Sequence, residues 1–441
     1  MEMGMKFVFF SVIFIIMLSE AELNLSKRST SFDKTNILID YLFPKEPGII
    51  RVRNAEEARA MNSVTTLDFI GLVERYGYPS EEHYVTTEDG YNLKIHRIPG
   101  SPLSNNQQTK PVVLLIHGIL CTSDCWVLLG PKKDLAFLLA DQGYDVWLGN
   151  YRGNSYCRSH VEMSPHDANF WQFSYHEIGT KDLPAMIDYV LNYTKYETLY
   201  YIGHSMGTTT LFALLSTKPE YNAKIRLGIC LAPVAIWKET GPIVRFLANV
   251  TPQIKEFLDS NEINELASLS TTTITAGRIL CADKTITQAI CIAVLFSIAG
   301  TDPAQLNTTV MPEILSYFPA GTSRKNLLHY SQNIITGNFQ NFDYGYLGNY
   351  ERYKQTTPMK YDLKKITAPI ALFYGANDVV VMRNVFQLYK QLPNIILLEE
   401  NPYKLFNHFD FLWAIDAKTL LYDRLMEVMQ KFDVESDPHR F

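Results

Sequence analysis

The chain has 441 residues, of which 47% are hydrophobic and 20% are charged. This composition is typical of a well-buried globular protein and excludes a disordered one, and the length allows one large domain with an insertion or two domains. The formal net charge of −6 at pH 7 argues against a nucleic-acid partner.

The first residues are predicted to be a targeting segment that is not part of the fold. Lys6 precedes an apolar run over residues 7–18, and residues 19–21 offer small side chains at cleavage spacing. We therefore expect a secretory signal peptide over residues 1–21, followed by a polar leader over residues 22–64. The apolar run is too short to span a bilayer, so an anchor is the less favoured interpretation and no transmembrane segment is expected.

Secretion agrees with four Asn-x-Ser/Thr sequons, each a candidate N-glycosylation site: Asn24, Asn192, Asn249 and Asn307. Secretion and lysosomal retention both remain open, because no motif in the chain decides between them.

The chain has six cysteines. In an oxidising compartment, cysteines tend to pair in disulfides. Cys281 and Cys291 are the best candidates, because they are close in sequence and flank a mostly polar loop. Cys230 lies in an apolar run and is expected to be a buried free thiol. The sequence leaves the pairing of the others open: Cys121, Cys125 and Cys157.

The ordered part is predicted to begin with a helix and a hairpin. Residues 65–76 have the apolar spacing of a helix, which Gly77 and Pro79 end. Residues 83–87 and 91–98 alternate as strands around the turn pair Asp89-Gly90, so we expect an N-terminal β-hairpin.

Residues 111–116 (PVVLLI) form a continuous apolar run, as expected of a strand buried on both faces of a parallel sheet. Gly118 then lets the chain turn so that the backbone N–H of Ile119 can reach an oxyanion, although an ordinary strand-ending turn has the same pattern. A helix over residues 133–142 and a strand over residues 145–148 follow. Arg152, in the next loop, is expected to form a structural ion pair.

After a helix over residues 176–193, the chain reaches the motif on which the functional prediction depends. Residues 199–202 form a short apolar strand, residues 203–207 are a G-x-S-x-G motif, and a helix continues to about Ser216. A serine on this sharp strand-to-helix turn, here Ser205, has its hydroxyl lifted clear of the sheet. The backbone N–H of Met206, at the start of the helix, then points to where an oxyanion would form.

The alternation of strands and helices continues through a strand at residues 227–231 and predicts a parallel sheet covered on both faces. It stops at Pro233, and residues 235–365 are largely helical in pattern. It then resumes with elements over residues 369–374 (strand), 383–391 (helix), 394–398 (strand) and 411–429 (helix). We therefore expect one α/β domain in two parts, residues 65–234 and 366–430, with an inserted helical cap and a polar tail over residues 431–441.

Residues 286–299 of the cap are almost wholly apolar but too few to cross a membrane. Two interpretations stay open: a helix in the core of the cap, or a lid whose apolar face covers the serine in water and opens onto lipid.

A reactive serine requires a histidine that takes its proton and a carboxylate that orients the histidine, in the chain order Ser, Asp or Glu, His for this type of turn. Asp378 follows a core strand, whereas three other aspartates lie in or beside the cap: Asp302, Asp343 and Asp362. His408 lies after the last strand, whereas His329 is in the cap and His439 is in the tail. Asp410 is expected to cap the last helix. This chemistry needs no cofactor and no metal ion.

With these residues in hand, the chain resembles the acid lipase family, which contains gastric lipase and lysosomal acid lipase. The matching strings include LLIHGIL, YDVWLGNYRGN, YIGHSMG, PAGTS, YGAND and NHFDFLWAIDA. The resemblance implies an α/β-hydrolase fold and hydrolysis of neutral lipid esters, triacylglycerols or sterol esters, at an oil–water or membrane interface. It implies a triad of Ser205, Asp378 and His408, with oxyanion N–H groups from Ile119 and Met206. It also implies a mobile lid around residues 267–299 and places a family disulfide at Cys281 and Cys291.

Three departures from the family bear on the site. Met206 stands where glutamine is frequent, the cysteine loop is one residue longer than in gastric lipase, and three cysteines at unfamiliar positions make an extra disulfide near the oxyanion loop conceivable.

Two other functions stay open: an esterase of small soluble esters, and a non-catalytic lipid-binding protein on the same fold. The second should have lost the serine, acid or base, and all three are present.

Overall fold

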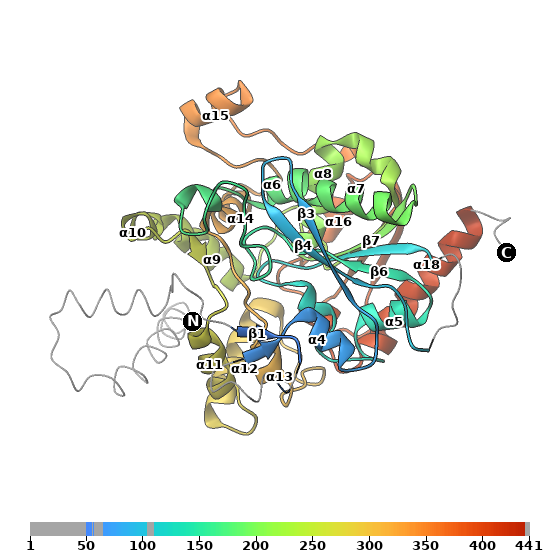
Figure 1. Ribbon diagram of the computed structural model, residues 1–441. Coiled ribbons are helices and arrows are strands. Elements are labelled where there is room, and N and C mark those ends of the chain that lie inside the picture. Colours follow the sequence, from blue (N-terminus) through green and yellow to red (C-terminus); the bar gives the residue numbers. More distant parts are fainter. Residues whose placement is uncertain (1–49, 55, 57–64, 104–109, 437–441) are drawn as a thin grey trace, which may run out of the picture.

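The computed structural model describes residues 50–54, 56, 65–103 and 110–436 (Figure 1). The predicted signal peptide, most of the predicted leader, the sequon at Asn24 and the last five residues lie outside this part of the chain.

The centre of the molecule is a mostly parallel sheet with strand order β12-β11-β8-β7-β5-β6-β4-β3. Only the β3–β4 and β4–β6 pairings are antiparallel. The strands are β3 (Glu81–Thr86), β4 (Asn92–Ile98), β5 (Val112–Ile116), β6 (Asp145–Leu148), β7 (Leu199–His204), β8 (Ile225–Leu231), β11 (Ile370–Tyr374) and β12 (Ile395–Glu400). The predicted hairpin is present as β3 and β4, and every residue of β5 and β7 is buried, as continuous apolar runs require.

Helices cover both faces of the sheet. In Figure 1, α7 (Leu183–Thr194) and α8 (Met206–Thr217) lie on one side, and α5 (Leu135–Asp141) and α18 (Asp423–Ser436) lie on the other. The remaining helices of this part are α4 (Phe69–Glu74), α6 (Tyr175–Glu177), α16 (Asn384–Tyr389) and α17 (Asp410–Trp413).

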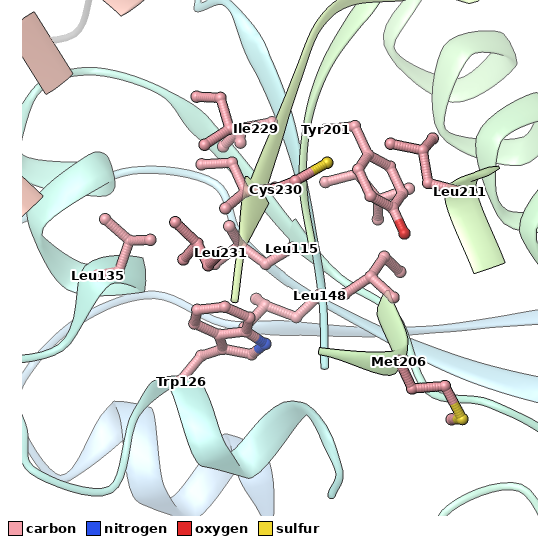
Figure 2. Close-up of a cluster of buried hydrophobic side chains, with 14 of the residues drawn as sticks. Leu115, Trp126, Leu135, Leu148, Tyr201, Met206, Leu211, Ile229, Cys230 and Leu231 are labelled. Carbon is pink, nitrogen blue, oxygen red and sulfur yellow. The ribbon is translucent and has the colours of Figure 1, made fainter. Parts of the chain in front are cut away.

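Side chains on the two faces of the sheet enter different halves of the core. Figure 2 shows Tyr201 of β7 beside Leu211 of α8, and Leu231 of β8 on the side of Leu135 from α5. All four are fully buried. The sheet is therefore a rigid platform, and its strand ends can position reactive side chains with precision.

The cap lies between β8 and β11 and is largely helical, as expected. It contains α9 (Pro242–Gln253), α10 (Lys255–Ser260), α11 (Thr271–Leu280), α12 (Ile286–Ala299), α13 (Met311–Ile314), α14 (Arg324–Thr336) and α15 (Gly345–Tyr353). Two very short strands, β9 (Glu265–Leu266) and β10 (Thr322–Ser323), pair antiparallel. Helices α9 to α12 gather on the left of Figure 1, to one side of the sheet.

The helix predicted over residues 65–76 is wrong in its first turn. Residues Thr65–Leu67 form a strand, β2, which pairs in parallel with β1 (Ile50–Val52) from the predicted leader. The helix α4 begins only after Asp68, whose carboxylate accepts the Gly71 N–H at 2.7 Å. This cap and the pairing with β1 override the local helical pattern.

Two other predicted helices are divided. The helix expected over residues 176–193 consists of α6, a π-helical turn and α7. The helix expected over residues 411–429 is α17, a break, a π-helical turn and α18, which continues to Ser436. The break is at extended Ala414, and the next N–H, that of Ile415, donates to the Gln305 carbonyl of the cap at 3.0 Å. A long-range contact therefore interrupts the helix.

Within the described residues, no helix combines the length and the apolarity that crossing a bilayer requires.

Candidate active site

Ser205 lies on the sharp turn between β7 and α8. Its backbone has φ 52° and ψ −114°, a conformation that non-glycine residues rarely adopt, and its N–H donates to the Leu231 carbonyl at 3.0 Å. The residue is 6% exposed. The turn therefore places the hydroxyl at the carboxyl edge of the sheet, as predicted for this motif.

Glycines around Ser205 permit close backbone contacts. A Cβ on Gly203 would lie 2.8 Å from the Gly207 backbone, and one on Gly207 would lie 2.5 Å from the Ile116 carbonyl oxygen. A Cβ on Gly118 would lie 3.2 Å from the Ser205 Cβ, so the loop after β5 packs directly on the serine. Larger residues at the first two positions would force the strand, turn and helix apart.

The structure brings Ser205, His408 and Asp378 together in one chain of hydrogen bonds. His408 Nε2 lies 2.8 Å from Ser205 Oγ, and His408 Nδ1 lies 2.8 Å from Asp378 Oδ2. Asp378 Oδ1 accepts the backbone N–H groups of Val380 and Val381, at 2.8 and 3.0 Å. All three side chains are buried. The carboxylate is therefore held on both oxygens and fixes the imidazole orientation.

Two loops carry the histidine and the aspartate, and we call them the base loop (residues 406–410) and the acid loop (residues 375–379). The acid loop follows β11 and the base loop lies between β12 and α17. Since β7, β8, β11 and β12 are neighbours in the sheet and run parallel, their carboxyl ends meet at the same edge. Sheet order thus brings residues about 200 positions apart into contact.

Ile119 lines the same cavity as Ser205, and Met206 follows Ser205 as the first residue of α8. Neither backbone N–H donates to an acceptor within the part of the chain that the structure describes. Leu120, directly after Ile119, has φ 63°, and its carbonyl accepts the N–H of Ala320 from the cap at 2.7 Å. The Met206 side chain turns away into a contact with Asn326, whose amide lies 3.3 Å from the Met206 sulfur.

A cavity of about 380 Å³ opens beside Ser205 and His408. Its walls are mainly apolar side chains of the cap: Val244 and Leu247 from α9, Ile298 from α12, and Leu327, Tyr330 and Ile334 from α14. An apolar cavity of this size next to a hydrogen-bonded serine suits a hydrocarbon chain attached to the reacting group.

Comparison with known proteins identifies the family of the chain. A family model described as a partial alpha/beta-hydrolase lipase region matches residues 69–130, and one described as an alpha/beta hydrolase fold matches residues 111–266. Lipase 1 of Drosophila melanogaster is 40% identical over 83% of this chain and 80% of its own length. Gastric triacylglycerol lipase of Homo sapiens is 37% identical over 83% of this chain and 92% of its own length. The chain belongs to the acid lipase family.

A solved structure described as a putative lipase from Sulfolobus solfataricus has a similar fold, with a TM-score of 0.53 and 16% identity over 80% of this chain and 94% of that one. At this identity the likeness concerns the fold alone.

One residue of this acid lipase site was not predicted from the sequence. His204, directly before Ser205, donates from Nε2 to the His408 carbonyl at 3.0 Å. The pKa of His204 is lowered well below its usual value, mainly by burial and to a smaller extent by the neighbouring His408. The ring therefore stays neutral. Its place within the motif was visible in the sequence, but no local signal indicates a bond to a loop about 200 residues away.

Asp410 does not cap the last helix as expected. It lies in the first turn of α17, whose capping position is Phe409. Its carboxylate instead accepts the Asn407 N–H at 2.7 Å, within the base loop.

The expected structural ion pair of Arg152 is confirmed, with Asp182 and Asp89 as its partners.

The cysteines of this acid lipase divide into one pair and four thiols. Cys281 and Cys291 form a disulfide that joins α11 to α12. The extra disulfide considered near the oxyanion loop is absent among the described residues, where the free thiols are Cys121, Cys125, Cys157 and Cys230.

The described residues contain no cluster of side chains that could hold a metal ion. Of the sequons, Asn192 and Asn249 are exposed and Asn307 is half-buried.

Proposed function

We propose that this protein is a secreted or lysosomal serine lipase that hydrolyses the carboxylic ester bonds of neutral lipids, triacylglycerols or sterol esters. The observation that carries the proposal is the hydrogen-bonded chain from Ser205 through His408 to Asp378, which opens onto an apolar cavity. The names of the relatives, gastric triacylglycerol lipase among them, agree with this substrate class.

In the proposed mechanism, Ser205 Oγ attacks the ester carbonyl carbon while His408 Nε2 accepts the hydroxyl proton. Asp378 stabilises the imidazolium that forms, and the N–H groups of Ile119 and Met206 stabilise the oxyanion. The proton then passes from His408 to the leaving alcohol, and an acyl-enzyme remains on Ser205. Water, deprotonated by His408, releases the fatty acid and restores the serine.

Helices α11 and α12, with their disulfide, are proposed as the lid over residues 267–299. Helix α12 (ITQAICIAVLFSIA) is apolar on all sides, yet only Gln288 and Ala299 are buried. Ile286 is 92% exposed and Ile290 is 41% exposed. An apolar helix that covers a substrate cavity and exposes further apolar side chains favours the lid over a helix in the cap core. Such a surface would bind at an oil–water interface.

The test compares hydrolysis of a triacylglycerol emulsion with that of a soluble short-chain ester, at about pH 5 and about pH 8, for the wild type and Ser205→Ala. We expect faster turnover on the emulsion and loss of turnover in Ser205→Ala, because the nucleophile is removed. Activity confined to the soluble ester would indicate an esterase. A folded wild type with no activity would indicate a lipid-binding protein.

A further inference from the structure

The peptide that joins Ser205 to Met206 carries one of the proposed oxyanion donors. Its N–H, that of Met206, donates to no acceptor among the described residues. Its carbonyl, that of Ser205, accepts the Thr208 N–H at 2.9 Å and the Thr209 N–H at 3.4 Å. The same carbonyl also accepts the Thr208 hydroxyl at 2.7 Å. Because a peptide unit is planar, the groups that hold this carbonyl also set the direction of the N–H.

The Thr208 hydroxyl is itself held by a second segment of the chain. Thr208 Oγ1 accepts the Val234 N–H at 2.8 Å, from the loop that follows β8. Since the Val234 N–H can only donate and the Ser205 carbonyl can only accept, the hydroxyl proton lies on the carbonyl. Thr208 is 0% exposed, so bulk water does not compete for either bond. The hydroxyl therefore has one fixed orientation.

A threonine hydroxyl in a helix often donates to a carbonyl three or four residues earlier, so this bond alone does not indicate a function. Thr210 makes the same kind of bond, to the Gly207 carbonyl at 3.1 Å, and its hydroxyl also lies 2.8 Å from that of Tyr151. The peptide that follows Gly207, however, has its N–H bonded to Ser205 within α8. The acceptor of Thr208 differs, because its peptide directs an N–H toward the proposed oxyanion.

The other proposed oxyanion donor has a similar arrangement. The Ile119 N–H belongs to the peptide whose carbonyl is that of Gly118, and this carbonyl accepts His117 Nδ1–H at 2.8 Å. His117 Nε2 accepts the side-chain amide of Asn154 at 3.3 Å. Burial lowers the pKa of His117 to about 4, so the neutral ring keeps one donor and one acceptor nitrogen above that pH. On both donor peptides, a buried side chain thus holds the carbonyl and is itself held from behind.

We propose that Thr208 is a positioning residue for ester hydrolysis, whose hydroxyl keeps the Met206 N–H directed at the oxyanion and strengthens it as a donor. A carbonyl that accepts a hydrogen bond polarises its peptide, and the N–H of that peptide becomes a better donor. Thr208 is not among the residues that line the cavity, so it acts through the Ser205–Met206 peptide. The inference rests on the proposed function.

The oxyanion forms only as the reaction proceeds, so a weaker oxyanion donor lowers kcat and leaves KM nearly unchanged. A purely structural role of Thr208 would not produce this division. A boronic acid that adds reversibly to Ser205 resembles the tetrahedral transition state, and its affinity reports on the same donor without turnover.

The experiment uses Thr208→Val, which removes the hydroxyl at nearly constant shape, and Thr208→Ser, which keeps it. Thr210→Val is the matched control, because Thr210 lies on the same helix, is also 0% exposed, and loses its bonds to Gly207 and Tyr151. For each full-length protein we would measure kcat and KM on a soluble short-chain ester, the Kd of an alkylboronic acid by calorimetry, and the Tm. If Thr208→Val does not fold, Thr208→Ala, which also lacks the hydroxyl, takes its place.

We expect Thr208→Val to lower kcat about fivefold, well below the roughly 100- to 1,000-fold loss that follows removal of an oxyanion donor. KM should change less than about twofold, and the Kd of the boronic acid should rise by about the same factor as kcat falls. Thr208→Ser should keep at least about half of the wild-type kcat. Thr210→Val should keep both kcat and Kd within about twofold, although its Tm falls.

Three results would overturn the proposal: an unchanged kcat in Thr208→Val, an equal loss in Thr208→Ser, or an equal loss in Thr210→Val. If even the wild type hydrolyses no ester, the proposed function fails. The affinities for the boronic acid then decide alone whether Thr208 positions the Met206 N–H.

Discussion

His408 is held at both ring nitrogens and at both ends of its own backbone. The ring bonds to Ser205 and Asp378, the N–H donates to Ala299, and the carbonyl accepts from His204. Proton transfer needs a donor–acceptor distance near 3 Å. Because these bonds fix the imidazole, it stays in the orientation in which it can accept the serine proton. The His204 bond thus joins the serine turn to the base loop at a second point, beside the bond between Ser205 and His408.

We predict that His204→Phe lowers kcat about fivefold and leaves KM unchanged. The ring that packs against Phe411 is retained, but the bond to the His408 carbonyl is lost, and one buried hydrogen bond is worth about 1 kcal/mol. Steady-state kinetics on a soluble ester would measure the change. His204→Gln, which keeps a donor near the same position, should recover most of kcat, and an equal loss in both variants would contradict the role of the bond.

At the scale of elements, the junction between α12 and the catalytic loops depends on a single glycine. Gly300 has φ 114°, and a Cβ there would lie 2.0 Å from the Asn377 carbonyl oxygen and 3.0 Å from the Asn407 Cβ. Both contacts are with the acid and base loops. The end of α12 and the two loops are thus packed as closely as backbone atoms allow.

We therefore predict that Gly300→Ala lowers the free energy of unfolding by more than about 3 kcal/mol, since backbone strain and a clash with backbone add together. Gly345→Ala is the matched control, because Gly345 also has positive φ, at 77°, but has no atom within 4 Å of its Cβ position. It should cost only about 1 to 2 kcal/mol. Urea unfolding would measure both, and equal losses would show that the close packing is unimportant.

At the scale of the whole molecule, the core and the cap are joined by a partly buried ion pair. Glu177 of α6 lies 3.2 Å from the Lys325 ammonium of α14. Burial alone would raise the pKa of Glu177, but Lys325, His176 and backbone donors together lower it to about 2. A carboxylate with a depressed pKa adds stability that is fully present above its unfolded pKa, near 4.5, and that is lost as the pH falls from there through about 2.

We predict that Glu177→Gln destabilises the protein by about 2 kcal/mol at pH 7 and by a small fraction of that at pH 2. The pH dependence arises because Gln cannot titrate, so only the wild type loses stability on acidification. Thermal unfolding at pH 7, 4 and 2 would measure the difference. A destabilisation that stays constant across this range would assign the effect to packing and not to charge.

The parts of the fold that were predictable from sequence are those with strong local signals. Continuous apolar runs identified β5 and β7, and the G-x-S-x-G motif identified the turn at Ser205. Asp378 and His408 were predictable because each follows a core strand. The family resemblance agreed with the same residues.

What could not be predicted depends on contacts between distant segments. The pairing of β2 with β1 and the bond from Ile415 to Gln305 overrode helical patterns that were locally sound. The approach of His204 to the base loop depends on the folded positions of β7 and the loop before α17. Local periodicity carries no information on such distances.

The separation of Ser205 from His408 along the chain has a consequence for the timing of biosynthesis. The serine turn is complete once α8 has been made, but the base arrives about 200 residues later, near the end of the chain. At typical synthesis rates that interval lasts roughly 10 to 40 seconds. Throughout that time the nascent chain contains a serine without the histidine that would take its proton, so it cannot react with ester lipids around it.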